Sequence, residues 1–426
     1  MLRGMYLTNP GPALFIFTAA ALLILAILIY RRLPLHRTVP DLPELKGVQT
    51  TRGDQLRTPA VDMETLSRSF REAGDYIVRN TDKNGKFGYE YNPAANAYLK
   101  RYNILRHAGT VYALCELYSA TKNGTLLSSA ELALQFLKEQ IHPFKGSKVV
   151  LWRDRVKLGG NALAILAFAE HAVVTGNNSN LPLMQDLARY IEHSQRDNGS
   201  FVSSRTYSTG EDSGFVSLYF PGEALLSLVR LYELDRNKQW LDRAERGARY
   251  LIEQRAQIPV SELVHDHWFL MALERLSRHR SNELYFNEAM RLANAFIGTQ
   301  WNSTTRKPED PAWIGGFYNP PRSTPTAIRA EGLIAAYRLA RRRNHARMMQ
   351  SILSSLSLAV RFQLQNQFNG SEVTFPNPQR AQGGFSASRE DPTIRIDYVQ
   401  HNASSILGLY HILKKEEAIA RGRRCC

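Results

Sequence analysis

Apolar and polar positions alternate along this chain with the period of an α-helix. From Val61 onward, apolar residues recur every three or four positions, and no run of alternating residues indicates a convincing strand. Six times, a polar cluster runs directly into a short apolar helix pattern, which a second, amphipathic pattern follows. The six clusters are Arg106-His107-Ala108-Gly109, Gly159-Gly160-Asn161, Pro221-Gly222-Glu223, His265-Asp266-His267-Trp268, Arg329-Ala330-Glu331-Gly332 and Asp397-Tyr398-Val399-Gln400-His401. Their spacing of roughly 45–65 residues predicts repeated helical hairpins.

The two kinds of helix pattern predict two concentric layers. The amphipathic patterns, expected on the outside, cover residues 63–80, 128–141, 181–195, 239–254, 284–300 and 346–366. Their partners, for example 162–169, 224–229 and 333–337, are small and apolar around most of the helix, which is typical of buried helices. Glycine and an aromatic residue follow several outer patterns, where a sharp turn and a plug between hairpins are expected. The predicted fold class is therefore all-α, an (α/α)6 toroid of six helical hairpins behind a single N-terminal transmembrane helix.

A membrane anchor is predicted ahead of the barrel. Residues 13–30 contain no charge and would span about 27 Å as a helix, close to the thickness of a bilayer core. Arg31 and Arg32 follow this segment, and no small-residue cleavage site does. The predicted organisation is a short tail at 1–12, the transmembrane anchor at 13–30, a tether at 31–60, the barrel domain at 61–415 and a basic tail at 416–426.

The chain is strongly basic, with a net charge of +15 and a pI near 9.7. The basic residues are spread along the sequence without a nucleic-acid-binding motif, so no nucleic-acid partner is predicted. Attraction to anionic lipid or to an acidic polymer would explain the charge, and a solvated basic surface is the alternative. Three cysteines exclude a disulfide-dense scaffold. The sequence leaves the oligomeric state open.

Candidate chemistry gathers at the starts of the inner helices. A ring of hairpins would bring these starts to one end, where unpaired N–H groups favour an anionic or hydroxyl-rich ligand. Glu331 and Asp397 are predicted to be the acid/base pair of a glycosidase, with Glu223 and Asp266 in reserve. The predicted substrate-binding residues are Arg106, His107, Trp152, Tyr219, His267, Trp268, Trp313, Arg329 and His401. Arg106 and Arg329 would bind an acidic group of the carbohydrate substrate.

Other interpretations of the same residues stay open. Two imidazoles with different pKa values could move a proton off and onto a sugar carbon, as an epimerase requires. Acids in a first helical turn are also stabilised by the helix dipole alone, and Asp397 could simply cap its helix. His265 and His267 have no identifiable third ligand, so neither a metal nor another cofactor is predicted. A non-catalytic barrel that binds a glycan or a protein is a further alternative.

The chain resembles the six-hairpin glycosidase superfamily over roughly residues 61–415. Asn103-Ile104-Leu105-Arg106-His107-Ala108-Gly109 and the segment 395–401 resemble signatures of an uncharacterised, membrane-anchored bacterial branch. The resemblance implies carbohydrate chemistry, and it implies a periplasmic barrel. The excess of Arg31, Arg32 and Arg37 after the anchor instead favours a cytoplasmic one. Gln195 to Phe201 resembles a repeat of terpene cyclases, but the Asp-rich motifs of those enzymes are absent from the sequence.

Overall fold

The computed structural model describes residues 61–424, which contain the predicted barrel. The predicted tail, anchor and tether at 1–12, 13–30 and 31–60 lie outside the described residues, as do Cys425 and Cys426. Within 61–424, one helix is long and apolar enough to cross a bilayer, Leu158–Thr175, and 78% of it is buried inside the protein. The predicted anchor at 13–30 therefore stays a prediction.

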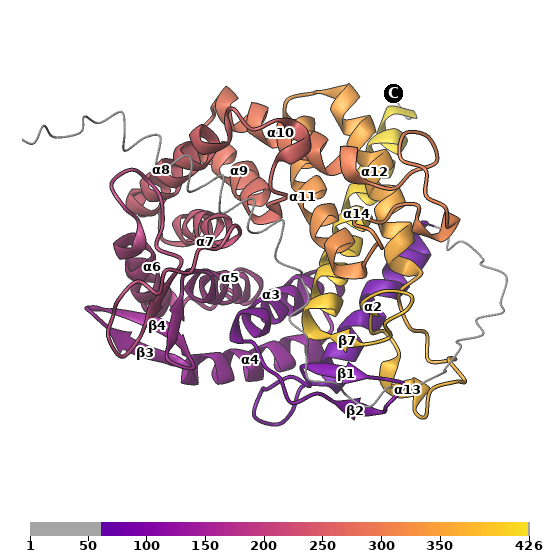
Figure 1. Ribbon diagram of the computed structural model, residues 1–426, viewed down its shortest axis with the longest axis horizontal. Coiled ribbons are helices and arrows are strands. Elements are labelled where there is room, and N and C mark those ends of the chain that lie inside the picture. Colours follow the sequence, from indigo (N-terminus) through magenta and orange to yellow (C-terminus); the bar gives the residue numbers. More distant parts are fainter. Residues whose placement is uncertain (1–60, 425–426) are drawn as a thin grey trace, which may run out of the picture. The chain divides into compact units, whose positions relative to one another are not determined.

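Twelve long helices within the described residues form two concentric rings (Figure 1). The inner helices are α3 (Ile104–Thr121), α5 (Leu158–Thr175), α7 (Phe220–Asp235), α9 (His267–His279), α11 (Ser323–Arg342) and α14 (Ile396–Arg424). The outer helices are α2 (Met63–Arg79), α4 (Gly124–Glu139), α6 (Leu181–Ser194), α8 (Lys238–Arg255), α10 (Glu283–Thr299) and α12 (Ala346–Leu364). Each inner helix packs against the next, and α14 packs against α3 and α2, so the ring is closed. The described part is thus an (α/α)6 toroid, as the sequence predicts.

Several outer helices begin where the sequence supplies a capping side chain. Asn123, Asn237 and Asn282 precede α4, α8 and α10, and each side chain accepts a hydrogen bond from the first turn. The observed bounds agree with the predicted ones to within a few residues. The last inner helix is an exception at its far end, because α14 continues to Arg424, beyond the predicted domain end at residue 415.

The connections at the two ends of the barrel differ in length. Inner helices pass to outer helices through short turns, such as Lys122-Asn123 and Arg236-Asn237, whereas outer helices return through the long segments 80–103, 195–219, 300–322 and 365–395. We call the end with the long segments the open end and the opposite one the closed end. Functional residues gather on such loops more often than on tight turns.

Two small sheets lie in segments that connect outer helices to inner helices, where the sequence predicted no strands. One has the order β2 (Ala97–Tyr98), β1 (Glu90–Asn92), β7 (Ile394–Arg395), and the other the order β3 (Ile141–Phe144), β4 (Ser147–Trp152), β5 (Arg155–Lys157), β6 (Ser204–Thr206). All of these pairs are antiparallel. The strands have only two to six residues, too few for a clear alternating pattern. The all-α class therefore holds for the barrel but omits these two sheets.

A repeated glycine turn joins neighbouring hairpins. Gly85, Gly199, Gly315 and Gly383 all have φ between +79° and +94°. A Cβ on any of them would overlap a backbone carbonyl of the next outer helix, which is Leu132, Arg246, Leu358 and Glu72 in turn. Two residues later comes a buried phenylalanine: Phe87, Phe201, Phe317 and Phe385. Only glycine fits both the left-handed backbone and the close approach, so these turns fix the spacing of the outer ring.

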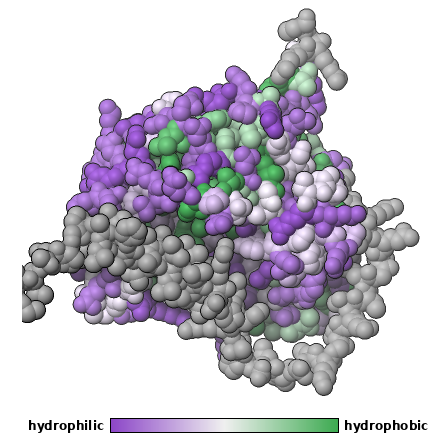
Figure 2. Space-filling view, turned by 45° about the horizontal axis from the view of Figure 1, so that its top comes forward, coloured by the Kyte–Doolittle hydropathy of each residue, from purple (hydrophilic) through white to green (hydrophobic). Residues whose placement is uncertain are grey.

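One face of the molecule is viewed in Figure 2. Hydrophobic residues gather toward the middle of this face, and hydrophilic residues surround them. Exposed large apolar side chains include Phe215, Val216 and Leu218 in the segment before α7, and Tyr318 in the segment before α11. These residues belong to long segments of the open end, where apolar contact area is available to a ligand or partner.

Candidate active site

The starts of the six inner helices meet around the barrel axis. Their glycines let polar side chains of adjacent helices come close: a Cβ at Gly159 of α5 would overlap the carboxylate of Glu223 of α7, and one at Gly222 of α7 would touch Asp266, which caps α9. In the same way, Gly332 of α11 lies against His267 of α9. Since Arg106 of α3 also pairs with Asp397 of α14, the predicted clusters occupy one level of the barrel.

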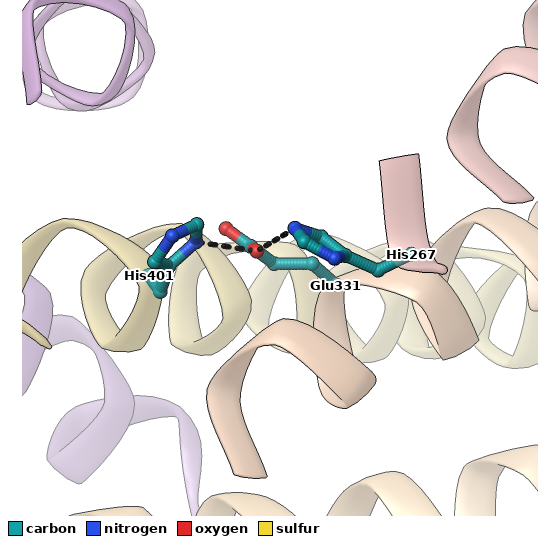
Figure 3. A group of neighbouring side chains, drawn as sticks. All are labelled: His267, Glu331 and His401. Carbon is teal, nitrogen blue, oxygen red and sulfur yellow. Dashed lines mark hydrogen bonds and ion pairs between the residues drawn. The ribbon is translucent and has the colours of Figure 1, made fainter. Parts of the chain in front are cut away.

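In this ring a carboxylate lies between two imidazoles. Glu331 on α11 lies between His267 on α9 and His401 on α14 (Figure 3). The Oε2 atom of Glu331 is 2.8 Å from Nδ1 of His401 and 3.7 Å from Nε2 of His267. The three side chains are only 5–12% exposed. Both ring nitrogens of His267 are buried, and neither has a hydrogen-bond partner within residues 61–424.

The pKa values of the two histidines are shifted in opposite directions. Burial lowers the pKa of His267 well below 6.5, and the nearby His401 lowers it further. Burial would also lower the pKa of His401, but the charge and hydrogen bond of Glu331, together with Asp397, raise it above 6.5. His267 therefore favours its neutral form, whereas Glu331 favours the protonated form of His401. Acid/base catalysis requires two groups whose pKa values differ in this way, one to accept a proton and one to donate it.

The same three residues could hold a metal ion. Their donor atoms, two nitrogens and one oxygen, all lie within 4.8 Å of one another. Two histidines and one carboxylate with open positions are a common ligand set for catalytic divalent metals. The sequence missed this set because Glu331 and His401 lie 64 and 134 residues after His267.

The carboxylate of Asp397 forms ion pairs with two arginines and is not paired with Glu331. Arg395 donates from Nε to Oδ1 at 2.5 Å and from its terminal nitrogen to Oδ2 at 2.9 Å, and Nε of Arg106 lies 3.1 Å from Oδ2. Although burial raises the pKa of Asp397, the hydrogen bonds of Arg395 and the charges of both arginines lower it below 3.8 overall. A carboxylate held in this way favours the ionised form, which suits the base or nucleophile of a glycosidase rather than its general acid.

Glu223 and Asp266 lie in the neighbouring part of the ring. Burial raises the pKa of Glu223 to about 8, with the charge of Asp266 adding to the effect, so Glu223 is protonated at neutral pH. Asp266 is fully buried, accepts a hydrogen bond from the Phe269 N–H at the start of α9 and pairs with Arg255 at 3.2 Å. These contacts are typical of a helix cap, and they give Asp266 a structural role.

Two other residues that were predicted to bind the substrate form hydrogen bonds inside the protein. His107 is fully buried between α3 and α4, where its ring nitrogens bond to the Tyr102 hydroxyl and the Ala133 carbonyl. Burial lowers its pKa to about 4. Arg329 is also buried and donates to Nδ1 of His265 at 2.8 Å. In this arrangement neither side chain is exposed to a ligand, and both instead join neighbouring segments.

The predicted aromatic residues are distributed over the open end. Trp268 is 5% exposed and packs against both His267 and His401, at ring-centroid distances of 4.8 and 6.3 Å. Tyr219 precedes α7 and is 36% exposed. Trp152 ends β4 beside Tyr102, and Trp313 pairs with Trp301 outside the ring of helix starts. Trp268 therefore contacts both imidazoles.

A cavity of about 180 Å³ reaches Glu331 from inside the barrel. It is lined by Trp268 and Glu331 at one side and by polar side chains of the inner helices, including Tyr112, Glu116 and Ser404. Ser404 donates to Glu116 at 2.8 Å, and burial raises the pKa of Glu116 to about 7. Glu116 is not among the predicted site residues, although a lone acid in the apolar pattern 112–118 is a recognisable signal.

Comparisons with known proteins agree with the fold. No protein-family model and no curated protein matches the sequence. Among solved structures, a D-mannose isomerase matches with a TM-score of 0.60 and 14% identity, covering 83% of this chain and 99% of that chain. The cellobiose 2-epimerase from Bacillus thermoamylovorans B4167 matches with a TM-score of 0.61 and 14% identity, over 82% and 99%. The GH76A alpha-1,6-mannanase from Salegentibacter sp. HEL1_6 matches with a TM-score of 0.58 and 12% identity, covering 83% of this chain and 100% of that chain.

These similarities define the class of the described domain. It is an (α/α)6 barrel with the architecture found in sugar isomerases, sugar epimerases and glycoside hydrolases. The resemblance to the six-hairpin glycosidase superfamily that the sequence predicts is confirmed at the level of the fold. A shared fold of this kind hosts several reactions, so the chemistry has to be argued from the residues of this chain.

Proposed function

We propose that this protein is a carbohydrate-active enzyme that epimerises or isomerises a sugar by proton transfer between His267 and His401. The observation that supports this proposal best is the placement of two imidazoles with opposite pKa shifts on either side of Glu331. Sugar isomerases and epimerases are also among the proteins of similar fold. Hydrolysis, which the sequence favoured, stays the alternative: the raised pKa of Glu331 suits a general acid, but the two arginines that lower the pKa of Asp397 make it a weak base.

The reaction follows from the protonation states. Neutral His267 takes a proton from the carbon next to the carbonyl of an open-chain sugar, and the electrons of that C–H bond form a C=C bond. Protonated His401 gives its proton to the carbonyl oxygen, producing an enediol. His267 then returns its proton to the same carbon, after rotation has exposed the opposite face, to give the epimer, or to the neighbouring carbon to give the isomer. In both cases the hydroxyl that becomes the carbonyl gives its proton back to His401. Glu331 keeps His401 charged and oriented.

Deuterium uptake tests the proposal. The full chain is incubated in heavy water with mannose, glucose, fructose and cellobiose, and the sugars are followed by NMR. We expect deuterium at the carbon next to the carbonyl without any change of chain length. His267→Asn and His401→Asn should each lower the exchange rate about 10²–10⁴-fold. His193→Asn, at an exposed position on α6, is the matched control and should retain the full rate.

The same experiment distinguishes the alternatives. Shortened oligosaccharides that carry ¹⁸O from labelled water would replace the proposal by hydrolysis. Loss of exchange after treatment with a chelator, with recovery on adding a divalent ion, would show that His267, Glu331 and His401 act through a metal. Binding of sugars without exchange or cleavage would favour the non-catalytic barrel.

A further inference from the structure

A second cavity at the open end is lined mainly by cations. It has a volume of about 330 Å³, and five basic residues contribute to its wall: Lys100, Arg101, Arg106, Arg153 and Arg395. The only acid in this wall is Glu90. Arg106 and Arg395 share the single carboxylate of Asp397, and in the described part of the chain no ion-pair partner lies within reach of the other three. The cavity therefore has an excess of positive charge.

The cations come from three different repeats. Lys100 and Arg101 precede α3, Arg395 precedes α14, and Arg153 occupies the turn between β4 and β5. Both residues of that turn, Arg153 and Asp154, have φ values of 51° and 55°, typical of a tight two-residue hairpin. The side chain of Asp154 also accepts hydrogen bonds from the backbone N–H and the hydroxyl of Ser208. Because rigid segments bring like charges together around one space, an anion in that space would relieve their repulsion.

The wall also offers groups suited to a sugar. Tyr89 and Tyr102 line the cavity with rings 5.3 Å apart, and aromatic faces pack well against apolar ring surfaces. One carboxylate oxygen of Glu90, Oε2, is buried and has no hydrogen-bond partner within residues 61–424. A ligand hydroxyl would satisfy such an oxygen. The cavity thus combines donors for an anionic group with an acceptor for a hydroxyl.

We infer that this cavity binds an acidic sugar residue, through its carboxylate or phosphate, as part of the substrate. The inference rests on the proposed function, because Arg106 links the cavity to the candidate active site through Asp397, whose charge acts on His401. The anionic group contacts Lys100, Arg101 and Arg153, and the reacting carbon lies toward His267 and His401. The preferred substrate is accordingly an acidic saccharide rather than a neutral one.

Binding measurements with defined probes test the inference. Glucuronate, glucose 6-phosphate and glucose are titrated by NMR into the full chain at low and high salt. We expect both acidic sugars to bind at least about tenfold more tightly than glucose, with an advantage that falls as salt screens the cations. The stronger of the two acidic probes identifies carboxylate or phosphate as the group recognised. Equal, salt-independent binding of all three sugars would overturn the inference.

Charge-removing variants locate the site. Arg153→Gln should weaken binding of the acidic probes about tenfold, and the further substitutions Lys100→Gln and Arg101→Gln should abolish their advantage over glucose. Lys83→Gln, an exposed lysine outside the cavity, is the matched control and should bind like the wild type. If the triple variant keeps the preference for acidic probes, the cavity is not their site.

The two proposals fail in distinguishable ways. Deuterium exchange is therefore followed in the wild type and in the Lys83→Gln control, on neutral mannose and on the acidic probes, beside the binding titrations. Exchange on mannose together with no preference for acidic sugars would reject the anion site alone. Selective binding of acidic sugars without exchange on any sugar would reject the proposed reaction and retain the site.

Discussion

Replacing Glu331 with glutamine should lower the pKa of His401. The substitution keeps the shape of the side chain and a hydrogen-bond acceptor near Nδ1, but it removes the negative charge that stabilises the imidazolium. In the wild type, that charge and its hydrogen bond overcome the burial that would otherwise lower the pKa of His401. Without it, burial dominates and His401 should become a neutral imidazole at pH 7, as His267 is.

The size of the change follows from the distance between the two groups. The closest atoms are 2.8 Å apart. At about 4 Å between charge centres and an effective dielectric constant of about 20, the gross attraction is about 4 kcal/mol. Part of it is offset by the hydrogen bond that glutamine retains, and opposite charges at this range change pKa values by about 1–3 units. We therefore expect the pKa of His401 to fall by about 1–3 units.

Histidine titration by NMR checks this expectation in protein with labelled imidazole rings. Glu223→Gln is the matched control, because Glu223 lies in the same ring of helix starts but is already neutral at pH 7. It should leave the pKa of His401 unchanged. An unchanged His401 pKa in Glu331→Gln would refute the reasoning, since the carboxylate would then not be what keeps the imidazole charged. The wild type should also lose stability as pH rises through the folded pKa of His401, and Glu331→Gln should not.

Three further predictions concern stability, each measured by denaturant unfolding. Burial raises the pKa of Glu223 from 4.5 to about 8, so the wild type should lose stability as pH rises through that window, whereas Glu223→Gln should lose less. Gly383→Ala should cost about 1–3 kcal/mol or more from its backbone conformation, whereas Gly298→Ala, with open space around its Cβ, should gain about 0.5–1 kcal/mol. Asp397→Asn leaves Arg395 without its buried carboxylate and should cost about 3–5 kcal/mol; a loss below about 1 kcal/mol would contradict the importance of this pair.

The repeating part of the fold could be predicted from the sequence because its signals are local. The outer helices have strong amphipathic patterns and capping asparagines, and glycine with phenylalanine marks the turns that follow them. The strands could not be predicted in this way. Glu90 pairs with Arg395 where the ring closes, and no local pattern records a contact between residues so distant in sequence.

The candidate site was predictable only in part. Polar residues at helix starts identified Glu331, His267 and His401, because a ring of parallel inner helices brings such positions to one level. The sequence did not show that Arg395 would hold Asp397, nor that His107 would face the outer helix α4 instead of the axis. Both outcomes depend on small rotations of a helix and on the packing of loops from other repeats.

The pairing of α2 with α14 has a consequence for biogenesis. Every other hairpin joins helices adjacent in sequence, but this one joins the first described helix to the last. Because α14 carries His401, a nascent chain that still lacks this helix has neither a complete proton-transfer pair nor a covered face on α2. The ring should close late, after translation has delivered its last segment. Cutting a surface turn elsewhere and joining the two ends would make the α2–α14 hairpin local, and a faster closing step in such a circular permutant would reveal how much this pairing limits folding.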